Sequence, residues 1–401
     1  MKKKILFLMP SLFIGGAERS LLALLEAFDF DQYEVDLFLF RHEGEFLPLL
    51  PEQIDLLPEI KAYGTFDVPI KKLLKSRYIL YGLARLTGKA AMKLHCFISR
   101  ERKGVWMSMQ YISRFLQPLL PEIPGEYDLA VSFLGIPDTL LYKVQAKKKI
   151  CWNHTDYTIL FPDHAYDRRI YRKLDRIVSV SEPCTEQFLK VYPEFSDKAM
   201  TVENLLSPAF LEEQAKEKIT DMQIRPGEIC ILSIGRFSDA KNFDNVPDIC
   251  MKLRKMGLPV HWFLIGYGGE EALIRRKIAE ADAESYVTIL GKKSNPYPYI
   301  KACDYYIQPS RYEGKAVTVR EAQILHKPVI ITNYATAGAQ LENGQDGVIV
   351  PMDNEGCAKG IAAVLRDPVL TQRIQRETCQ RDYSNRQELG KILVLIDADR
   401  S

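Results

Sequence analysis

Short runs of apolar residues recur along the whole chain, and longer amphipathic stretches separate them. In the first half these runs cover residues 5–9, 35–40, 129–133, 149–152, 177–181 and 200–202. In the second half they cover residues 229–234, 262–265, 287–290, 305–308, 329–332 and 348–350. Continuous apolar runs of this kind are typical of parallel strands buried on both faces. Their alternation with helical stretches predicts an α/β fold of doubly wound domains.

The length of the chain favours two such domains, because 401 residues exceed what one hydrophobic core usually supports. The pattern breaks near residues 204–207. A charged segment that favours helix follows at 211–222, and Pro226-Gly227 precedes the next apolar run. We therefore predict a first domain over residues 1–206 and a second over residues 207–379, with a last helix near residues 384–396.

Two carboxylates eight residues apart, Glu313 and Glu321, are the most informative feature of the sequence. A predicted strand and a turn rich in Pro, Ser and Gly precede a helix that begins at Val317. Glu313 is thus expected in the loop and Glu321 about two turns inside the helix. The positive N-terminus of such a helix suits a phosphate, and carboxylates on either side can hold sugar hydroxyls. The stretch therefore indicates a nucleotide-sugar site.

This stretch resembles the E-x7-E signature of the retaining glycosyltransferases of family 4, which have the GT-B fold and include bacterial surface-polysaccharide enzymes. Four further segments match that family in type and order: Gly15-Gly16-Ala17-Glu18-Arg19, Gly235-Arg236-Phe237 with Lys241-Asn242-Phe243, Ile265-Gly266-Tyr267-Gly268, and Asn343-Gly344-Gln345-Asp346-Gly347. The resemblance runs from about residue 4 to about residue 392 and is strongest over 229–351. It implies two Rossmann-like domains facing a cleft, with the segment 380–401 packing back onto the first domain.

The second domain is expected to bind the nucleotide sugar without a metal ion. Arg236 and Lys241 follow an apolar run, at the end of the strand where α/β sheets place ligands, and two cations there can neutralise a diphosphate. The resemblance places Glu313 beside the transferred sugar and Glu321 at the ribose hydroxyls. It assigns further donor contacts to Gly16, Gly291 and Lys292. Gly235 and Gly314 are also expected at the donor, and the backbone N–H groups of Lys315, Ala316, Val317 and Thr318 are expected to face the phosphates.

The first domain is expected to contribute Gly16 and His154. Gly16 follows the first predicted strand, where glycine allows a close backbone approach. The resemblance implies that His154 touches the donor sugar from the opposite wall, although a histidine at a strand end is also often structural. Asp156 and Tyr157 are candidates for the acceptor side. The fingerprint G-x-G-x-x-G is absent, which argues against a dinucleotide cofactor.

A metal site is not expected. Asp29-Phe30-Asp31 spells a D-x-D motif but lies in a predicted connecting loop, and the eight cysteines form no C-x-x-C pair. We expect no cofactor besides the nucleotide-sugar substrate.

Residues 71–103 form the one region with a lopsided charge. It contains ten basic residues and one acid, Glu101, with apolar residues interleaved; the basic residues are Lys71, Lys72, Lys75, Arg77, Arg85, Lys89, Lys93, Arg100, Arg102 and Lys103. Docking on an anionic membrane is the favoured interpretation, and a plain solvated face is the alternative. No nucleic-acid recognition motif accompanies the charge.

No apolar run is long enough to span a bilayer, and residues 1–10 favour a buried first strand over a signal peptide. We therefore expect a cytoplasmic protein that docks on the inner face of the membrane.

The resemblance predicts an enzyme that transfers a hexose-type unit, with retention of anomeric configuration, from a nucleotide sugar to a hydroxyl. UDP-sugar is the expected donor, and a glycan or lipid-linked sugar is the expected acceptor, in cell-surface polysaccharide synthesis. Two alternatives remain open: a nucleotide-sugar epimerase of the same fold, and a non-catalytic subunit that resembles a glycosyltransferase.

Overall fold

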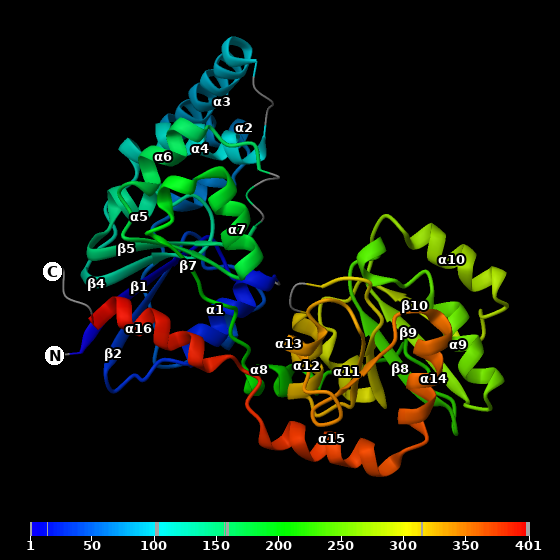
Figure 1. Ribbon diagram of the computed structural model, residues 1–401. Helices are drawn as coiled ribbons and strands as arrows, with labels where there is room; N and C mark the ends of the chain where they lie inside the picture. The colour runs from blue at the N-terminus through cyan, green and yellow to red at the C-terminus, as the bar shows by residue number, and fades with distance from the viewer. Residues whose placement is uncertain are drawn as a thin grey trace. The chain divides into compact units, whose positions relative to one another are not determined.

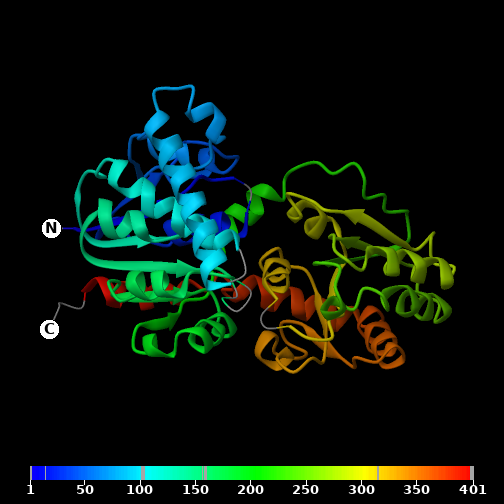
Figure 2. The same cartoon turned by 90° about the horizontal axis from the view of Figure 1, so that it is seen from above.

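The computed structural model describes residues 2–13, 15–100, 104–155, 157, 160–313 and 316–397. The chain forms two compact units. The first comprises Met1–Leu205 together with Asn385–Ser401, and the second is Leu206–Ser384. Both chain ends therefore belong to the first unit (Figures 1 and 2). No described helix has the length and apolar character needed to cross a bilayer.

The first unit is built on a seven-stranded sheet in the order β3-β2-β1-β4-β5-β6-β7. All its strand pairs are parallel. The strands are β1 (Lys3–Met9), β2 (Tyr33–Leu39), β3 (Asp55–Leu56), β4 (Glu126–Ser132), β5 (Gln145–Asn153), β6 (Arg176–Ser179) and β7 (Ala199–Thr201). Each predicted run overlaps a strand, and the pattern missed only the two-residue β3.

Helices cover both faces of this sheet. They are α1 (Gly16–Glu26), α2 (Ile70–Leu73), α3 (Ile79–Ser99), α4 (Val105–Leu116), α5 (Asp138–Lys143), α6 (His164–Tyr171), α7 (Glu182–Val191) and α16 (Leu389–Asp397). Figure 1 shows α4, α5 and α6 on one face and α1 and α16 on the other. Lys148 of β5 donates to the carbonyl of Leu395 at 2.7 Å, which fixes α16 against this sheet.

The second unit has a six-stranded parallel sheet in the order β10-β9-β8-β11-β12-β13. Its strands are β8 (Ile229–Ile234), β9 (Val260–Ile265), β10 (Val287–Gly291), β11 (Tyr305–Gln308), β12 (Val329–Thr332) and β13 (Val348–Val350). Its helices are α8 (Pro208–Gln214), α9 (Val246–Lys255), α10 (Glu271–Glu280), α11 (Tyr297–Ala302), α12 (Val317–Ile324), α13 (Ala337–Gln340), α14 (Asn354–Leu365) and α15 (Pro368–Gln380). The predicted α/β fold of two doubly wound domains is confirmed.

The predicted helix over residues 211–222 was too long, because α8 ends at Gln214. The side chain of Asn295 donates to the carbonyl of Gln214 at 2.9 Å, which occupies an acceptor at the end of the helix. Asp221 then accepts a hydrogen bond of 2.7 Å from Tyr299. These tertiary contacts outweigh the helix propensity of the charged segment.

The last helix predicted near residues 384–396 is a 3-10 helix, Arg386–Glu388, followed directly by α16, so the segment 380–401 is not one continuous helix. Helix α15 continues to Gln380, and α16 begins only at Leu389. Between them Asn385 adopts a left-handed conformation with φ 57°. The two chain passages between the units are bonded to each other. The N–H of Leu206 donates to Ser384 at 2.8 Å, and the side chain of Asn385 donates to the carbonyl of Asn204 at 3.2 Å.

Candidate functional site

The site in the second unit forms where the order of its strands reverses. Strand β8 lies between β9 and β11, so successive connections lead away from it in opposite directions. In open α/β sheets ligands bind at such a switch point, outside the carboxyl ends of the strands. The loop after β8 carries Arg236 and Lys241, and the loop after β11 carries Glu313.

These two loops are tied together by polar contacts. The side chain of Asn242, whose φ is 58°, donates to the carbonyl of Pro309 at 2.8 Å. Arg311 donates to both carboxylate oxygens of Asp244, at 2.9 and 2.8 Å, and its N–H donates to Ala240 at 2.8 Å. A bidentate pair fixes direction as well as distance, so the loops form one rigid platform.

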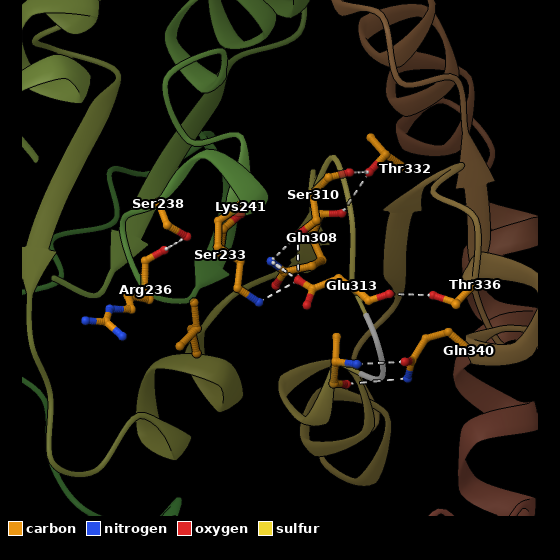
Figure 3. A network of polar contacts seen from close by, with 12 residues as sticks. Ser233, Arg236, Ser238, Lys241, Gln308, Ser310, Glu313, Thr332, Thr336 and Gln340 are labelled. Carbon is orange, nitrogen blue, oxygen red and sulfur yellow. Dashed lines mark hydrogen bonds and ion pairs between the residues drawn. The ribbon is translucent and has the colours of Figure 1, made fainter. Parts of the chain in front are cut away.

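Glu313 and Lys241 meet on this platform (Figure 3). The ammonium of Lys241 donates to Oε1 of Glu313 at 2.5 Å. The same oxygen accepts from the hydroxyl of Ser310 at 2.6 Å and from the amide of Gln308 at 3.5 Å. Both side chains are mostly buried, with 18% of Lys241 and 11% of Glu313 exposed.

A buried chain of donors stands behind Glu313. The hydroxyl of Tyr306 donates to Oε1 of Gln308 at 2.7 Å, and Nε2 of Gln308 donates to Ser310 at 2.9 Å. The hydroxyl of Ser310 is thereby directed at Glu313. Tyr306, Gln308 and Ser310 are fully buried, so this chain holds one carboxylate oxygen in a fixed position.

The structure does not join Arg236 to this pair. Its side chain is exposed, and Figure 3 shows the guanidinium directed away from Glu313. The structure gives a reason for glycine at the preceding position, Gly235. A Cβ at residue 235 would lie 3.0 Å from Cε of Lys241. Glycine therefore leaves room for the lysine that contacts Glu313.

The glycines after β9 and β10 also permit close backbone approach. A Cβ on Gly266 would lie 1.9 Å from the carbonyl oxygen of Gly235. The N–H of Gly266 donates to the carbonyl of Gly291, whose φ is 73°, at 3.0 Å. The side chain of Lys292 lies over the ring of Tyr267, 5.1 Å from its centroid. Gly291 and Lys292 thus lie at the same sheet edge as the platform.

Helix α12 begins at Val317 as predicted, and Gly314 and Lys315 lie outside the described residues. The N–H of Ala316 donates to Oε1 of Gln340 at 2.9 Å, so a side chain occupies one amide that was expected to face phosphate. Val317 and Thr318 are the first two residues of the helix, where N–H groups lack partners within the helix.

Glu321 is the fifth residue of α12, so it lies about one turn inside the helix and the prediction of two turns was wrong. Its side chain is buried, and its Oε1 accepts a hydrogen bond of 2.9 Å from the hydroxyl of Tyr297. Tyr297 is the first residue of α11, where the Pro-Tyr-Pro-Tyr segment begins a helix.

In the first unit, Gly16 and His154 lie at the carboxyl edge of the sheet. Gly16 is the first residue of α1, after β1, and His154 directly follows β5. Nε2 of His154 lies 2.9 Å from the carbonyl oxygen of Phe133, so this nitrogen carries the proton. Burial lowers the pKa of His154 to about 4, which keeps the imidazole neutral near pH 7.

Two candidates for the acceptor side do not gain support. Asp156 lies outside the described residues. Tyr157 is buried, and its hydroxyl donates to Asp167 at 2.6 Å within a cluster that includes Tyr171 and Tyr192. The expectation that Tyr157 lines an acceptor surface was wrong, because its polar end is used inside the core.

Asp29 and Asp31 lie on the exposed connection between α1 and β2. The carboxylate of Asp29 accepts from the N–H of Asp31 at 3.0 Å and from Gln32 at 2.6 Å, as a turn residue does. Within the part of the chain that the structure describes, no cluster of three His, Cys, Asp or Glu side chains could hold a metal ion.

Sequence reasoning missed three residues of the site, namely Gln308, Ser310 and Tyr297. The first two precede Glu313 by five and three residues, and Ser310 was read only as a turn former. No local signal could have paired Tyr297 with Glu321, because helix packing brings the two together.

Comparison with known proteins shows which family this part of the chain is similar to. Residues 214–381 match the family model of glycosyl transferases group 1. These residues lie within the second unit. The matched segment contains Arg236, Lys241, Glu313 and Glu321 and covers less than half of the chain.

Curated relatives are distant and match in part. The amylovoran biosynthesis glycosyltransferase AmsK of Erwinia amylovora is 28% identical over 161 residues, which is 38% of each chain. The N-acetylgalactosamine-N,N'-diacetylbacillosaminyl-diphospho-undecaprenol 4-alpha-N-acetylgalactosaminyltransferase of Campylobacter jejuni is 24% identical over 214 residues, 53% of this chain and 56% of that protein. The chain thus matches about two fifths to just over half the length of these relatives.

Solved structures share the fold over nearly the whole chain. HepE of Anabaena, in complex with UDP, aligns with a TM-score of 0.56 at 16% identity, covering 98% of this chain and 99% of that one. TarM aligns with a TM-score of 0.58 at 14% identity, covering 99% of both chains. WaaG, a glycosyltransferase involved in lipopolysaccharide biosynthesis, aligns with a TM-score of 0.54 at 14% identity, covering 98% of this chain and all of that one.

Proposed function

We propose that this protein is a retaining glycosyltransferase that transfers a hexose-type sugar from a UDP-sugar to a hydroxyl of a glycan or lipid-linked acceptor in bacterial surface-polysaccharide synthesis. The names of the relatives support this setting, since they include amylovoran biosynthesis enzymes and a transferase named for a diphospho-undecaprenol substrate. UDP is the expected nucleotide because HepE and TarM were solved with it.

The observation that carries the proposal is the Lys241–Glu313 pair at the switch point of the second sheet. Glycosyl transfer must neutralise a departing diphosphate while positive charge develops on the sugar. In our proposal Lys241 and the exposed side chain of Arg236 supply cationic charge, and the N-terminus of α12 supplies amides. The chemistry then requires no metal ion.

The two carboxylates would hold the two sugars of the donor. Oε1 of Glu313 is occupied by donors from the protein, which leaves Oε2 for hydroxyls of the transferred sugar. Glu321 would accept from the ribose hydroxyls, because a carboxylate matches a vicinal diol as a paired acceptor. Neutral His154, whose Nδ1 can accept a hydrogen bond, would orient a sugar hydroxyl.

The proposal is tested with full-length protein and a panel of UDP-, GDP- and ADP-sugars. A bound donor should raise the unfolding temperature in proportion to its occupancy. Slow release of the nucleoside diphosphate should persist in a chelator. The variants Glu313→Ala and Lys241→Ala should each lose about 100-fold in turnover.

Matched controls are Glu284→Ala and Lys255→Ala, which remove exposed residues of the same unit. Full activity in both site variants would refute the proposal.

An epimerised nucleotide sugar, formed without an acceptor, would favour the epimerase instead. Retention is checked by the anomeric configuration of the product in NMR spectra.

A further inference from the structure

Helix α3 of the first unit exposes an unusual number of large apolar side chains. Seven of them are exposed, from 43% for Leu86 to 83% for Phe97; they are Ile79, Leu80, Leu83, Leu86, Leu94, Phe97 and Ile98. Their spacings of three, four, seven and eleven residues place them along one side of the helix. We call these seven side chains the α3 stripe. Figure 1 shows α3 projecting beyond the sheet of its unit.

The α3 stripe is not needed for packing within the unit, because α3 uses its other side for that purpose. Gly88 lies against α4, where a Cβ would come within 2.8 Å of the carbonyl oxygen of Tyr111. Met92 and Cys96 are buried in a small cluster with Met107 and Tyr111 of α4. A helix that is apolar on two opposite sides has a second contact to make.

The charged residues of the segment that carries the stripe are all basic. No Asp or Glu occurs from residue 71 to residue 100. Seven basic side chains of this range are exposed, namely Lys71, Lys72, Lys75, Arg77, Lys89, Lys93 and Arg100. Arg85 must be removed from the predicted basic face, because it is buried and donates to the carbonyl of Thr65 at 2.6 Å. Arg102 and Lys103 lie outside the described residues.

From this arrangement we infer that α3 lies flat on an anionic lipid bilayer, with the α3 stripe at the acyl boundary and the lysines and arginines at the lipid phosphates. An interfacial helix has this combination of one apolar side and a basic border. Lys93, one heptad after Leu86, lies at the edge of the stripe. At 1.5 Å per residue the helix offers about 30 Å of contact.

The charge of the patch argues for a bilayer rather than for a second copy of the chain. Two copies joined through this surface would bring both sets of basic side chains together, and residues 71–100 supply no acid to pair with them. A leaflet that contains anionic lipids neutralises them instead, at about 1 kcal/mol for each residue near the surface. The role of this membrane contact rests on the proposed function, because a lipid-linked acceptor would be presented at the bilayer surface.

The inference is tested by co-sedimentation of the full chain with vesicles of phosphatidylglycerol and phosphatidylcholine, and with vesicles of phosphatidylcholine alone. The wild type should bind the anionic vesicles. The variant Leu83→Gln/Leu94→Gln should bind them at least tenfold more weakly. The variant Lys89→Gln/Lys93→Gln should lose about thirtyfold. The control Val394→Gln removes an exposed apolar side chain of α16 and should bind as the wild type does.

Two further measurements decide the outcome. In the variant Phe97→Trp the added fluorescence should shift to shorter wavelength with anionic vesicles. Light scattering should show a monomer for both the wild type and the variant Leu83→Gln/Leu94→Gln, or the same oligomer for both. A wild-type dimer that the variant dissociates would overturn the inference. Equal vesicle binding by the wild type and that variant would also overturn it. Vesicle binding is measured without a nucleotide sugar. A failure of membrane binding can therefore be distinguished from a failure of the proposed activity, which is measured as release of UDP.

Discussion

The hydroxyl of Tyr297 donates a hydrogen bond of 2.9 Å to Oε1 of Glu321, and both side chains are buried. The two residues belong to different helices, α11 and α12. A buried carboxylate needs donors to remain charged and correctly directed. Tyr297 therefore helps to hold Glu321 in its orientation.

We expect the variant Tyr297→Phe to raise the KM for the nucleotide sugar by about tenfold, because a hydrogen bond to a charged group is lost. The value of kcat should change less, since Glu321 is assigned to the ribose and not to the reacting sugar. Donor titrations by initial rate measure both. Tyr305→Phe is a matched control, because its hydroxyl contacts Thr371 at 3.2 Å near the start of β11. A KM that is unchanged in Tyr297→Phe would remove Glu321 from the donor site.

The buried chain of donors behind Glu313 leads to a different expectation. Ser310→Ala should lower kcat by about tenfold, because Glu313 loses a donor that fixes its Oε1. The KM for the donor should stay within a factor of two or three. Steady-state rates of nucleotide release provide both constants.

Ser238→Ala is the control for that change. The hydroxyl of Ser238 contacts only the carbonyl of Arg236, at 3.4 Å, among the contacts described. Equal rates for Ser310→Ala and the wild type would mean that Lys241 and Gln308 suffice to position Glu313.

His154 should make the stability of the protein depend on pH. Burial lowers its pKa from the ordinary 6.5 to about 4, so the unfolded chain binds more protons between these pH values. The corresponding stabilisation is fully present above pH 6.5 and is lost as the pH falls towards 4. Relative to His154→Asn, the free energy of unfolding of the wild type should therefore rise by up to about 3 kcal/mol across this window. Urea unfolding at several pH values measures it, and parallel curves for the two proteins would contradict the buried neutral imidazole.

Arg85 should stabilise the first unit and should contribute little to surface charge. Its guanidinium donates to the carbonyls of Thr65 and Val68, and burial lowers its pKa. Arg85→Met should reduce the free energy of unfolding by about 3 kcal/mol, because two buried carbonyls lose their donor. Lys89→Met, at an exposed position of the same helix, should change it by less than about 0.5 kcal/mol. Thermal or urea unfolding distinguishes them.

Most strands were predictable because a strand that is buried on both faces appears in the sequence as a continuous run of apolar residues. Residues 329–332 are all apolar except the final threonine, and all four lie in the buried strand β12. The two-residue strand β3 is too short to form such an apolar run. The extent of α8 could not be predicted either, because Asn295, eighty-one residues away, bonds the end of that helix.

The site was predictable in composition but not in geometry. Lys241 and Glu313 could be assigned from their motifs, but the loop contact between Arg311 and Asp244 joins residues 67 positions apart. The direction of a side chain also depends on its neighbours in space. Arg236 was assigned with Lys241, yet its guanidinium faces away from Glu313 (Figure 3).

The second unit is one uninterrupted piece of chain, whereas the first is assembled from both ends, with α16 supplied by residues close to the C-terminus. During synthesis on the ribosome the second unit can therefore fold before the first has all of its parts. A premature stop codon near residue 385 would leave the second unit intact and would deprive the first unit of the helix that packs against its sheet.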